Sequence, residues 1–248
     1  MYNISAGISK LSQTSFADEL EAAKTLGINN IEIDDKFDGT PIWELDGNKT
    51  EDVRNLLIDS NKKIVLLRTE LPVNRLEDYR KLFRTAHLML IENVKVPLPE
   101  SEAEIDLLYE IAKIAMSYGI RMLFENKAHS LAEDDASMTA LYKKFKGLHI
   151  GFVYNPLEFV AMQRHPFFHM FYTSKLKNHI VFMRLNDGLY STLEPKPLCE
   201  GNAEVKELVS ILLARSFEGY FSLTPYMGNG LEDLKKSHEE LKTILKSI

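Results

Sequence analysis

Short runs of apolar residues alternate with longer stretches of helical periodicity from one end of the chain to the other. Most of the short runs are almost continuously apolar, as in "KIVLLRT" at residues 63–69. Such runs are typical of strands that are covered on both faces. The pattern therefore predicts strands at residues 2–7, 30–34, 63–69, 87–92, 120–126, 148–154, 179–185 and 219–224.

The longer stretches have apolar residues at helical spacing, and several begin with a residue type that commonly caps a helix. Ser15 is placed to cap the first of them, which Gly27 can end. Ser101 and Glu104 have the spacing of a capping box at the start of a later helix. Thr50 is the predicted cap of a helix that lies between these two. Together the boundaries predict a helical segment after each strand.

Strands and helices in strict alternation, at roughly 25 to 35 residues a unit, match the connection that parallel strands require. We therefore predict the α/β class and a single (β/α)8 TIM barrel over residues 1–248. The competing fold is an open, doubly wound sheet, which usually has a G-x-G-x-x-G turn after its first strand. The segment "SAGISKLSQTS" at that place lacks this motif, so the barrel is preferred.

Composition narrows the class of protein further. The 248 residues are 45% hydrophobic, which is enough for a sizeable core, and the net charge is −6. Because acidic and basic residues are mixed along the chain, with no basic stripe, we expect no nucleic-acid partner. No apolar run approaches the length of a membrane span or a signal peptide. Since the single Cys199 cannot form an internal disulfide, these features predict a cytoplasmic protein without a membrane partner.

A TIM barrel has its active site at the carboxyl ends of its strands, and polar residues lie at most of the predicted strand ends. They are Glu32, Arg68, Glu125, Asn126, Asn155, Arg184, Asn186, Asp187 and Thr224. This mixture of charges and amides suits a small hydroxylated or anionic ligand. The alternative is that strand ends carry charges for solubility alone. That reading is weakest for Glu125 and Arg184, which follow apolar runs and would be costly if buried unpaired.

The segment "HPFFHMFYTSKL" at residues 165–176 combines aromatic residues with two histidines. His165 and His169 have the i,i+4 spacing of a metal pair, but no glutamate completes an H-E-x-x-H motif. A surface or packing pair is therefore the preferred interpretation. The aromatic content is typical of a core helix or of a contact between subunits, so a homodimer is one expectation.

Three further polar residues lie beyond strand ends. His129 follows the fifth strand and is a candidate ligand-binding group. Lys95 and Lys127 fall in loops, where a lysine would be poorly activated as a Schiff-base nucleophile. Phosphate binding is the better functional interpretation for these two cations, and ordinary surface charge is the alternative.

Several segments match a known pattern. "FADELEAAKTLGINNIEI" is similar to an opening helix and a strand that ends in glutamate. "YGIRMLFEN" resembles a strand ending in Glu-Asn, "LHIGFVYNP" one that usually ends in Asp-Pro, and "HIVFMRLNDG" one that usually ends in His-x-Lys-Asp. The run from "PLCEGN" to "YFSLTPY" resembles a Pro-Leu-Gly-Glu-Gly-Asp run, a helix and a last strand ending in glutamate. In this way nearly the whole chain resembles the xylose isomerase-like TIM barrels, the sugar phosphate isomerase/epimerase group to which the family 2 apurinic endonucleases are related.

The resemblance implies a divalent metal, which active relatives hold with glutamate, aspartate, histidine and glutamate on strands five to eight. Carried over to this sequence, the four positions are Glu125, Asn155, Arg184 and Thr224. Only the first is still a carboxylate, and an arginine cannot bind a metal because its guanidinium stays protonated. We therefore expect neither the Mn, Mg or Zn of metal-dependent relatives nor another cofactor. A charge-assisted pair between Glu125 and Arg184 is expected in its place.

The resemblance implies a sugar or sugar-phosphate isomerase or epimerase, with the small-molecule sugar as its partner. Glu125 is the expected catalytic base, and Arg184 is expected to stabilise charge on the substrate in the metal's place. Substrate contacts are expected from Asn126, His129, Asn155, Asp187, Arg68, Thr224 and Glu32. The alternative is a non-catalytic protein that binds a small polyol. An apurinic endonuclease is least favoured, because such enzymes need several metals and this chain lacks a basic surface.

Overall fold

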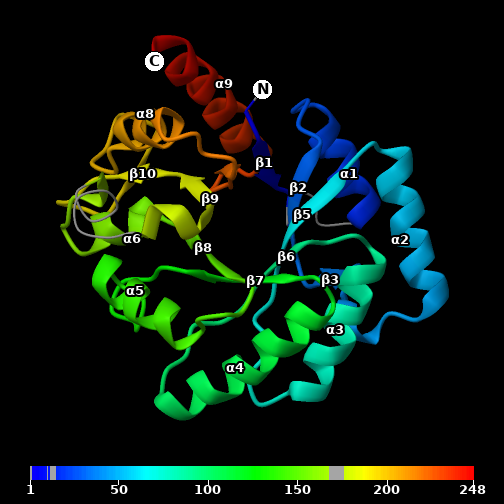
Figure 1. Cartoon of the computed structure of the whole chain (residues 1–248). Helices are drawn as coiled ribbons and strands as arrows, with labels where there is room; N and C mark the ends of the chain where they lie inside the picture. Colours follow the sequence, from blue (N-terminus) through cyan, green and yellow to red (C-terminus); the bar gives the residue numbers. More distant parts are fainter. Residues whose placement is uncertain (1, 10, 12–14, 168–175) are drawn as a thin grey trace. The chain divides into compact units, whose positions relative to one another are not determined.

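The computed structural model describes residues 2–9, 11, 15–167 and 176–248. Its barrel strands are β1 (Ile4–Gly7), β2 (Asn30–Asp34), β5 (Lys63–Arg68), β6 (Asn93–Lys95), β7 (Arg121–Glu125), β8 (Ile150–Tyr154), β9 (Ile180–Leu185) and β12 (Tyr220–Leu223). These strands follow one another round a closed barrel in the order β1, β12, β9, β8, β7, β6, β5 and β2. Figure 1 shows helices alternating with the strands along the chain. The predicted (β/α)8 TIM barrel is therefore confirmed.

Except for α9, which follows the last strand, the described helices lie between successive barrel strands. They are α1 (Phe16–Lys24), α2 (Gly47–Asp59), α3 (Leu76–Leu88), α4 (Glu102–Ser117), α5 (Asp135–Lys144), α6 (Pro156–Ala161), α8 (Val205–Ala214), α9 (Leu231–Ser247) and the short 3-10 helices η1 (Ile42–Glu44) and η2 (Leu176–His179). Two separate small sheets pair β3 (Lys36–Phe37) with β4 (Thr40–Pro41) and β10 (Asp187–Gly188) with β11 (Pro195–Lys196). Their two-residue strands are too short for a periodic signal. Among the described residues, no helix is long and apolar enough to cross a membrane.

The chain divides into two compact units. The N-terminal unit contains residues 5–124 and 144–151, and the C-terminal unit contains residues 1–4, 125–143 and 152–248. Within the N-terminal unit, α3 and α4 pack side by side (Figure 1). Within the C-terminal unit, β9 pairs in parallel with both β8 and β12. The polar residues near the carboxyl ends of these three strands, together with Glu125 and Asn126 at the end of β7, are the basis of the candidate site.

The predicted fourth strand at residues 87–92 is wrong, because β6 begins only at Asn93. The helix α3 continues into the predicted strand, and Leu90 then adopts a left-handed conformation with a φ of 60°. Ile91 turns back and donates its backbone N–H to the carbonyl of Ala86. The apolar run "HLMLIE" is thus the last turn of a helix and its termination, which periodicity alone does not distinguish from a buried strand.

Two predicted helix starts are confirmed. Ser15 caps α1, and its side chain accepts a hydrogen bond from the backbone N–H of Asp18 at 3.2 Å. Gly27 follows that helix with a φ of 66°, a left-handed conformation that glycine adopts without a steric penalty. Ser101 caps α4 and accepts from the backbone N–H of Glu104 at 3.3 Å. Capping residues therefore located these helices correctly.

The prediction that Thr50 caps α2 is wrong. The helix begins at Gly47, and the side chain of Asp46 caps it by accepting from the backbone N–H of Lys49 at 2.8 Å. Thr50 lies inside the helix and donates its hydroxyl to the carbonyl of Asp46 at 2.7 Å. Gly47 and Asn48 are poor helix formers, so the first turn carries no helical signal in the sequence.

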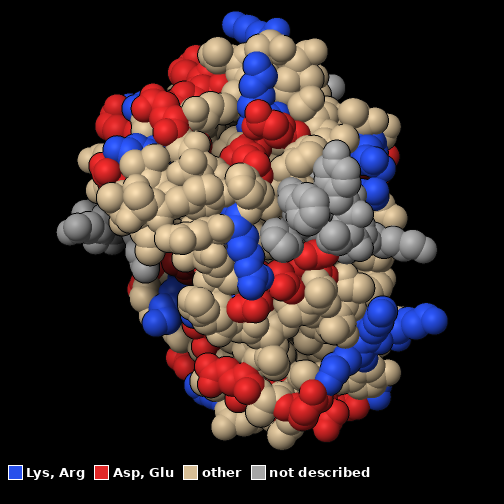
Figure 2. Space-filling model, turned by 90° about the vertical axis from the view of Figure 1, so that its left-hand side faces the viewer, with Lys and Arg blue, Asp and Glu red and all other residues tan. Residues whose placement is uncertain are grey.

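Surface charges are mixed. On the face in Figure 2, lysine and arginine side chains are interspersed with aspartate and glutamate. Several described cations pair along a helix, as Lys113 does with Glu110 at 2.9 Å and Lys242 with Glu239 at 2.7 Å. Such exposed pairs contribute about 0–1 kcal/mol each, so they matter for solubility more than for the stability of the fold.

Candidate functional site

The carboxylate of Glu125 and the guanidinium of Arg184 form an ion pair in the C-terminal unit. Glu125 is the last residue of β7 and Arg184 lies in β9, so the pair reaches across the end of the intervening strand β8. The Nε of Arg184 donates to Oε1 of Glu125 at 3.2 Å, and Nη2 donates to Oε2 at 3.2 Å. Two such bonds make a bidentate contact with a fixed geometry. The predicted pair is therefore confirmed.

The pair is largely shielded from water, since 4% of the Arg184 side chain and 19% of the Glu125 side chain are exposed. The Oγ of Ser222 accepts a further bond from Nη1 of Arg184 at 2.5 Å. Ser222 is fully buried in β12, directly opposite Arg184 in the parallel register. A buried cation is costly without partners. Here Glu125 at the end of β7 and Ser222 in β12 both bind the guanidinium of Arg184 and hold it in place.

Asn155 links the carboxylate to a second amide. It follows β8 and caps α6, where its Oδ1 accepts from the backbone N–H of Leu157 at 3.2 Å. Its Nδ2 donates to Oε1 of Glu125 at 3.0 Å. The same Oδ1 accepts from Nδ2 of Asn186 at 2.9 Å. An amide therefore stands at the position where the resembling family has a carboxylate, and it binds Glu125 instead of repelling it.

The carboxylate sets the direction of this chain of amides. An ionised carboxylate only accepts hydrogen bonds, so Asn155 turns its NH2 group to Glu125 and offers its carbonyl oxygen to Asn186. Asn186 consequently uses its NH2 group on Asn155. Its own Oδ1 is buried and has no hydrogen-bond partner among the described residues. An unpaired buried acceptor costs about 1–3 kcal/mol, so this atom is suited to a donor such as a ligand hydroxyl or a water.

Asn126 holds the end of β8 in place. Its Nδ2 donates to the carbonyl of Asn155 at 2.9 Å, and its Oδ1 accepts from the backbone N–H of the same residue at 2.6 Å. Asn126 is itself 1% exposed. Both polar groups of Asn126 are thus bonded to the backbone of Asn155, and its contact with a substrate stays a prediction.

Asp187 organises the loop that leads from β9 to α8. Its side chain is fully buried, and Oδ1 accepts from the backbone N–H groups of Gly188 and Ala203, both at 2.8 Å. Oδ2 accepts from the N–H of Gly201 at 3.0 Å. Burial raises the pKa of this carboxyl, and the backbone N–H groups oppose the rise. These contacts hold the loop around Asp187, and the binding of a substrate by this residue stays a prediction.

Two other predicted residues lie near the ends of C-terminal strands. His129 is exposed in the loop after β7, with a φ of 59°. Thr224 is half-buried just beyond β12. Of the two spaced histidines, His165 has its Nδ1 3.0 Å from Oε1 of Glu204, and His169 falls outside the described residues. The preference for a surface role of His165 agrees with its exposed side chain.

The remaining candidates belong to the N-terminal unit. Glu32 is fully buried and accepts from Oγ of Ser5 at 2.6 Å. Arg68 pairs through Nη2 with Asp34 at 3.0 Å, while its Nε is buried without a hydrogen-bond partner among the described residues. Lys95 stands opposite Arg68 in the register of β5 and β6, and it pairs with a glutamate just beyond β5 at 2.9 Å. Glu32 and Lys95 are thus bonded within their own unit, whereas Arg68 keeps one buried donor unpaired among the described residues.

The side chains present do not fit a divalent metal at the place where the resemblance implies one. Of the four positions only Glu125 is a carboxylate, and both of its oxygens accept from Arg184. A guanidinium offers no lone pair to a cation and repels it. Within the described part of the chain, no group of three or more histidine, cysteine, aspartate and glutamate side chains is arranged to hold a metal.

Comparison with known proteins extends the description of the fold. No family model and no curated protein matches the sequence. A xylose isomerase domain protein from Planctomyces limnophilus matches the structure with a TM-score of 0.81 at 11% identity, over 100% of this chain and 98% of that one. A xylose isomerase-like TIM barrel protein from Mycobacterium smegmatis, solved in complex with magnesium, matches with 0.80 at 16% identity over 100% and 97%. A D-tagatose 3-epimerase-like protein matches with 0.78 at 18% identity over 98% and 97%.

These likenesses show that the chain has the fold of the xylose isomerase-like TIM barrels, as the sequence resemblance predicts. The sequence did not assign roles to Ser222 and Asn186. The signal for Ser222 is a single polar residue inside the apolar strand "YFSL", two positions before Thr224 on the same face. Ser222 belongs to the site because the guanidinium of Arg184, on the adjacent strand β9, donates a hydrogen bond to it.

Proposed function

We propose that this protein acts on a small sugar or sugar phosphate as an isomerase or epimerase, without the divalent metal of the resembling family. The observation that carries the proposal is the bidentate ion pair of Glu125 with Arg184 at the carboxyl ends of β7 and β9. A proton acceptor and a fixed cation stand together at the face where such barrels hold their active sites. The fold is shared with a D-tagatose 3-epimerase-like protein, which supports a sugar as the class of ligand.

In the isomerase reaction, the carboxylate of Glu125 takes the proton from the hydroxyl-bearing carbon next to the carbonyl. The electron pair of that C–H bond forms an enediolate, whose negative oxygen Arg184 stabilises. Glu125 returns the proton to the former carbonyl carbon, while the hydroxyl proton of the first carbon passes to the former carbonyl oxygen. The buried Oδ1 of Asn186 accepts a hydrogen bond from a hydroxyl of the substrate and orients the substrate.

One feature of the pair favours a second candidate function. Both carboxylate oxygens of Glu125 accept from Arg184, and one also accepts from Asn155. A substrate must loosen one of these bonds before the carboxylate can take a proton, at a cost of about 1.5–3 kcal/mol for a bond to a charged group. A protein that only binds a polyol has no such requirement. The non-catalytic polyol-binding protein is therefore retained as the alternative.

A solvent-exchange assay tests the proposal. Candidate ketoses and their phosphates are incubated in D2O with the full chain, and NMR follows deuterium at the carbons next to the carbonyl, with EDTA and again with added Mn2+. We expect exchange that survives EDTA and falls at least about 100-fold in Glu125→Gln, the range for loss of a general base. Glu51→Gln, an exposed site on α2, is the matched control and keeps the wild-type rate.

Each other outcome has a definite meaning. Exchange that appears only with added Mn2+ contradicts the metal-free mechanism. Saturable binding of a polyol without exchange, measured by saturation-transfer NMR, supports the alternative function. Exchange that is equal in wild type and Glu125→Gln removes Glu125 from the chemistry, because the glutamine side chain cannot accept the proton.

A further inference from the structure

A cavity of about 210 Å3 lies in the C-terminal unit at the opposite ends of the strands from the Glu125–Arg184 pair. Its walls come from η2, directly before β9, from the last turn of α8, and from the segment that leads from α8 to β12. They are Lys177, Asn178, Leu212, Arg215 and Phe217. Because β9 and β12 are paired in parallel, their amino ends lie together at this cavity and their carboxyl ends at the ion pair. The two places are therefore separate.

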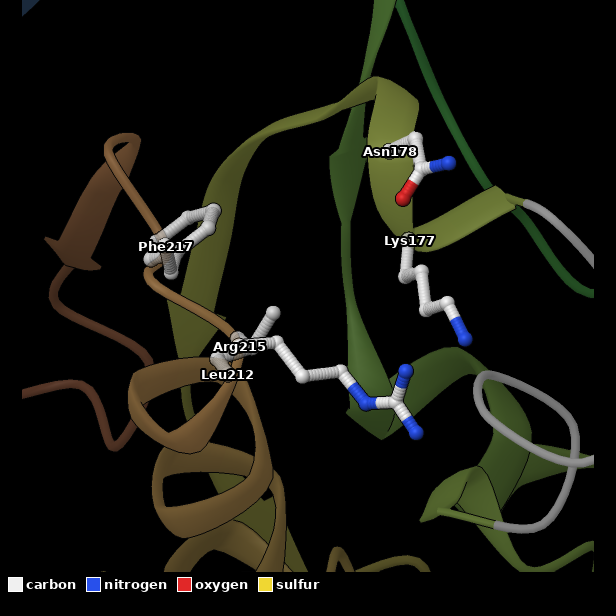
Figure 3. Close-up of a pocket in the computed structure, with 5 residues that line it drawn as sticks. All are labelled: Lys177, Asn178, Leu212, Arg215 and Phe217. Carbon is white, nitrogen blue, oxygen red and sulfur yellow. The ribbon is translucent and has the colours of Figure 1, made fainter.

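Two cations share this cavity. Figure 3 shows the side chains of Lys177 and Arg215 extending in the same direction from two different elements, with their charged ends on the same side of the cavity. Within the described part of the chain, neither forms an ion pair with a carboxylate. Other cations of the same unit do, as Arg164 does with Asp134 at 3.1 Å. Two unpaired positive charges in one concave place make a field that attracts an anion.

A helix end explains one of these cations but not both. Arg215 directly follows α8, and a cation at the carboxyl end of a helix is favourable because it lies at the negative end of the helix dipole. Lys177 lies on η2, which precedes the neighbouring strand β9, and its side chain lines the same cavity. Like charges that converge in this way repel each other unless an anion lies between them.

The other walls give the cavity a fixed shape. Leu212 is buried, and the ring of Phe217 packs over Gly219, where an added Cβ would lie 2.4 Å from the ring and 2.3 Å from the carbonyl oxygen of Val181. Ser216 has a φ of 56° and forms a turn, and the side chains of Arg215 and Phe217 on either side of it point in opposite directions (Figure 3). The apolar wall is thus closely packed against the backbone, whereas Lys177 is half-buried and Arg215 is exposed.

We propose that this cavity is an anion site that binds a phosphate group, either as inorganic phosphate or as the phosphate of a small phosphomonoester. Its volume is below the roughly 300–1,000 Å3 of pockets that enclose drug-sized ligands, so a compact anion suits it better than a large metabolite. A phosphate carries close to two negative charges at neutral pH and matches an ammonium and a guanidinium. The exposed amide of Asn178 adds a hydrogen-bonding group at the edge.

Calorimetric titration of the full chain with inorganic phosphate at low ionic strength tests the proposal. We expect one saturable site per chain, and a Kd at least about tenfold higher in the double variant Lys177→Gln/Arg215→Gln. The matched control is Lys146→Gln/Arg54→Gln, which removes the same two charges from exposed positions elsewhere and leaves the Kd within twofold. A second titration with glycerol 3-phosphate, with glycerol as its neutral control, distinguishes the two sources of phosphate. Tighter binding of the ester than of inorganic phosphate indicates the phosphomonoester.

A measurement on the wild-type chain keeps the test independent of how the variants fold. Addition of inorganic phosphate is expected to shift the backbone NMR signals of Leu212 and Phe217, because both line the cavity. An unchanged Kd in a folded Lys177→Gln/Arg215→Gln variant overturns the proposal. Failure of both phosphate compounds to saturate overturns it as well, as do shifts that occur only at Ser222 and its neighbours.

Discussion

Removing the carboxylate of Glu125 leaves the guanidinium of Arg184 buried with less than its native set of partners. Breaking a buried ion pair in this way costs about 3–5 kcal/mol, so we expect Glu125→Ala to lower the free energy of unfolding by about 3 kcal/mol. The further change Arg184→Met removes the buried charge as well, and we expect the double variant Glu125→Ala/Arg184→Met to be more stable than Glu125→Ala alone. Urea denaturation measures both differences.

The matched control for this pair is Glu51→Ala on the exposed face of α2. Surface substitutions of this kind usually change the free energy of unfolding by less than about 0.5 kcal/mol. If Glu125→Ala behaves like this control, Arg184 does not depend on Glu125, and the ion pair is not what holds the site together.

His149 gives a prediction about pH. His149 is an exposed side chain, but partial burial lowers the pKa of its imidazole, and the adjacent cation of Arg121 lowers it further. The Nε of Arg121 donates to Nε2 of His149 at 3.0 Å, which requires a neutral ring. We therefore expect the NMR titration of His149 to lie below the ordinary histidine pKa of about 6.5, and Arg121→Gln to raise it. Arg54→Gln, at an exposed position, is the control and leaves the pKa of His149 unchanged.

The sign of the associated stability effect follows from the direction of the shift. Because the native pKa of His149 is depressed, the unfolded chain binds the proton more strongly than the native chain does. The contribution of His149 to stability is complete above the unfolded pKa of about 6.5 and is lost as the pH falls through the native pKa. A His149 pKa above 6.5 in the wild type, or one that Arg121→Gln lowers, contradicts this account.

At the scale of elements, two glycines with different surroundings give opposite predictions. A Cβ at Gly201 would lie 2.3 Å from Oδ1 of Asp187 and 2.5 Å from the carbonyl oxygen of Gly188. We expect Gly201→Ala to destabilise the chain by about 1–3 kcal/mol, the usual cost of overpacking, because the loop before α8 must move off Asp187. Gly47, at the start of α2, has no atom near the corresponding position.

Gly47→Ala serves as the control, since alanine favours the helix and restricts the unfolded chain. It is expected to leave stability unchanged or to raise it by up to about 1 kcal/mol. Thermal and urea unfolding of the two variants measure the difference. Equal effects would mean that the contact between Gly201 and Asp187 is not tight in solution.

Sequence patterns located most elements because the barrel strands are apolar on both faces and several helices start with a capping side chain. The patterns gave wrong predictions where a short segment of sequence fitted two kinds of local structure. "HLMLIE" is apolar enough for a strand, but it begins in the last turn of α3, where His87 and Leu88 are exposed and Met89 is buried. Thr50 is a good capping residue, but Asp46 precedes it and captures the helix start. The competition between two adequate local signals was decided by packing, which a pattern does not contain.

At the scale of the whole molecule, one part of the candidate site could be predicted from the sequence and another part could not. The order of strands in a barrel is enough to predict that Glu125 and Arg184 meet, because both stand near the ends of strands that flank a common neighbour. The other hydrogen-bond partners in the site depend on the register of the strands and on the length of the side chains. Arg184 binds Ser222, directly opposite in the pairing of β9 with β12, and Asn126 is committed to the backbone of Asn155. Side-chain length and hydrogen-bond direction set those partners, and neither is visible in residue spacing.

The ring of positions that the resemblance identifies as metal ligands can be tested through the stability of the whole barrel. The wild type presents one carboxylate and a guanidinium there, so we expect neither EDTA nor added Mn2+ to change its Tm. The triple variant Asn155→Asp/Arg184→His/Thr224→Glu supplies the ligand set of metal-dependent relatives together with Glu125. Its Tm should rise with Mn2+ concentration, because a ligand at 100 times its Kd stabilises the native state by about 2.7 kcal/mol.

Adding Glu125→Gln to that triple variant is the matched control, and it should weaken the response to Mn2+ because one anionic ligand is lost. Without metal, the triple variant is expected to be less stable than the wild type, since its carboxylates repel one another once the guanidinium is gone. A wild-type Tm that rises with Mn2+ would contradict this view of the site. If the triple variant responds to Mn2+ and the wild type does not, Arg184 occupies the place of a metal cation in this barrel. A single arginine and a bound metal are then alternative ways to neutralise the negative charge of Glu125.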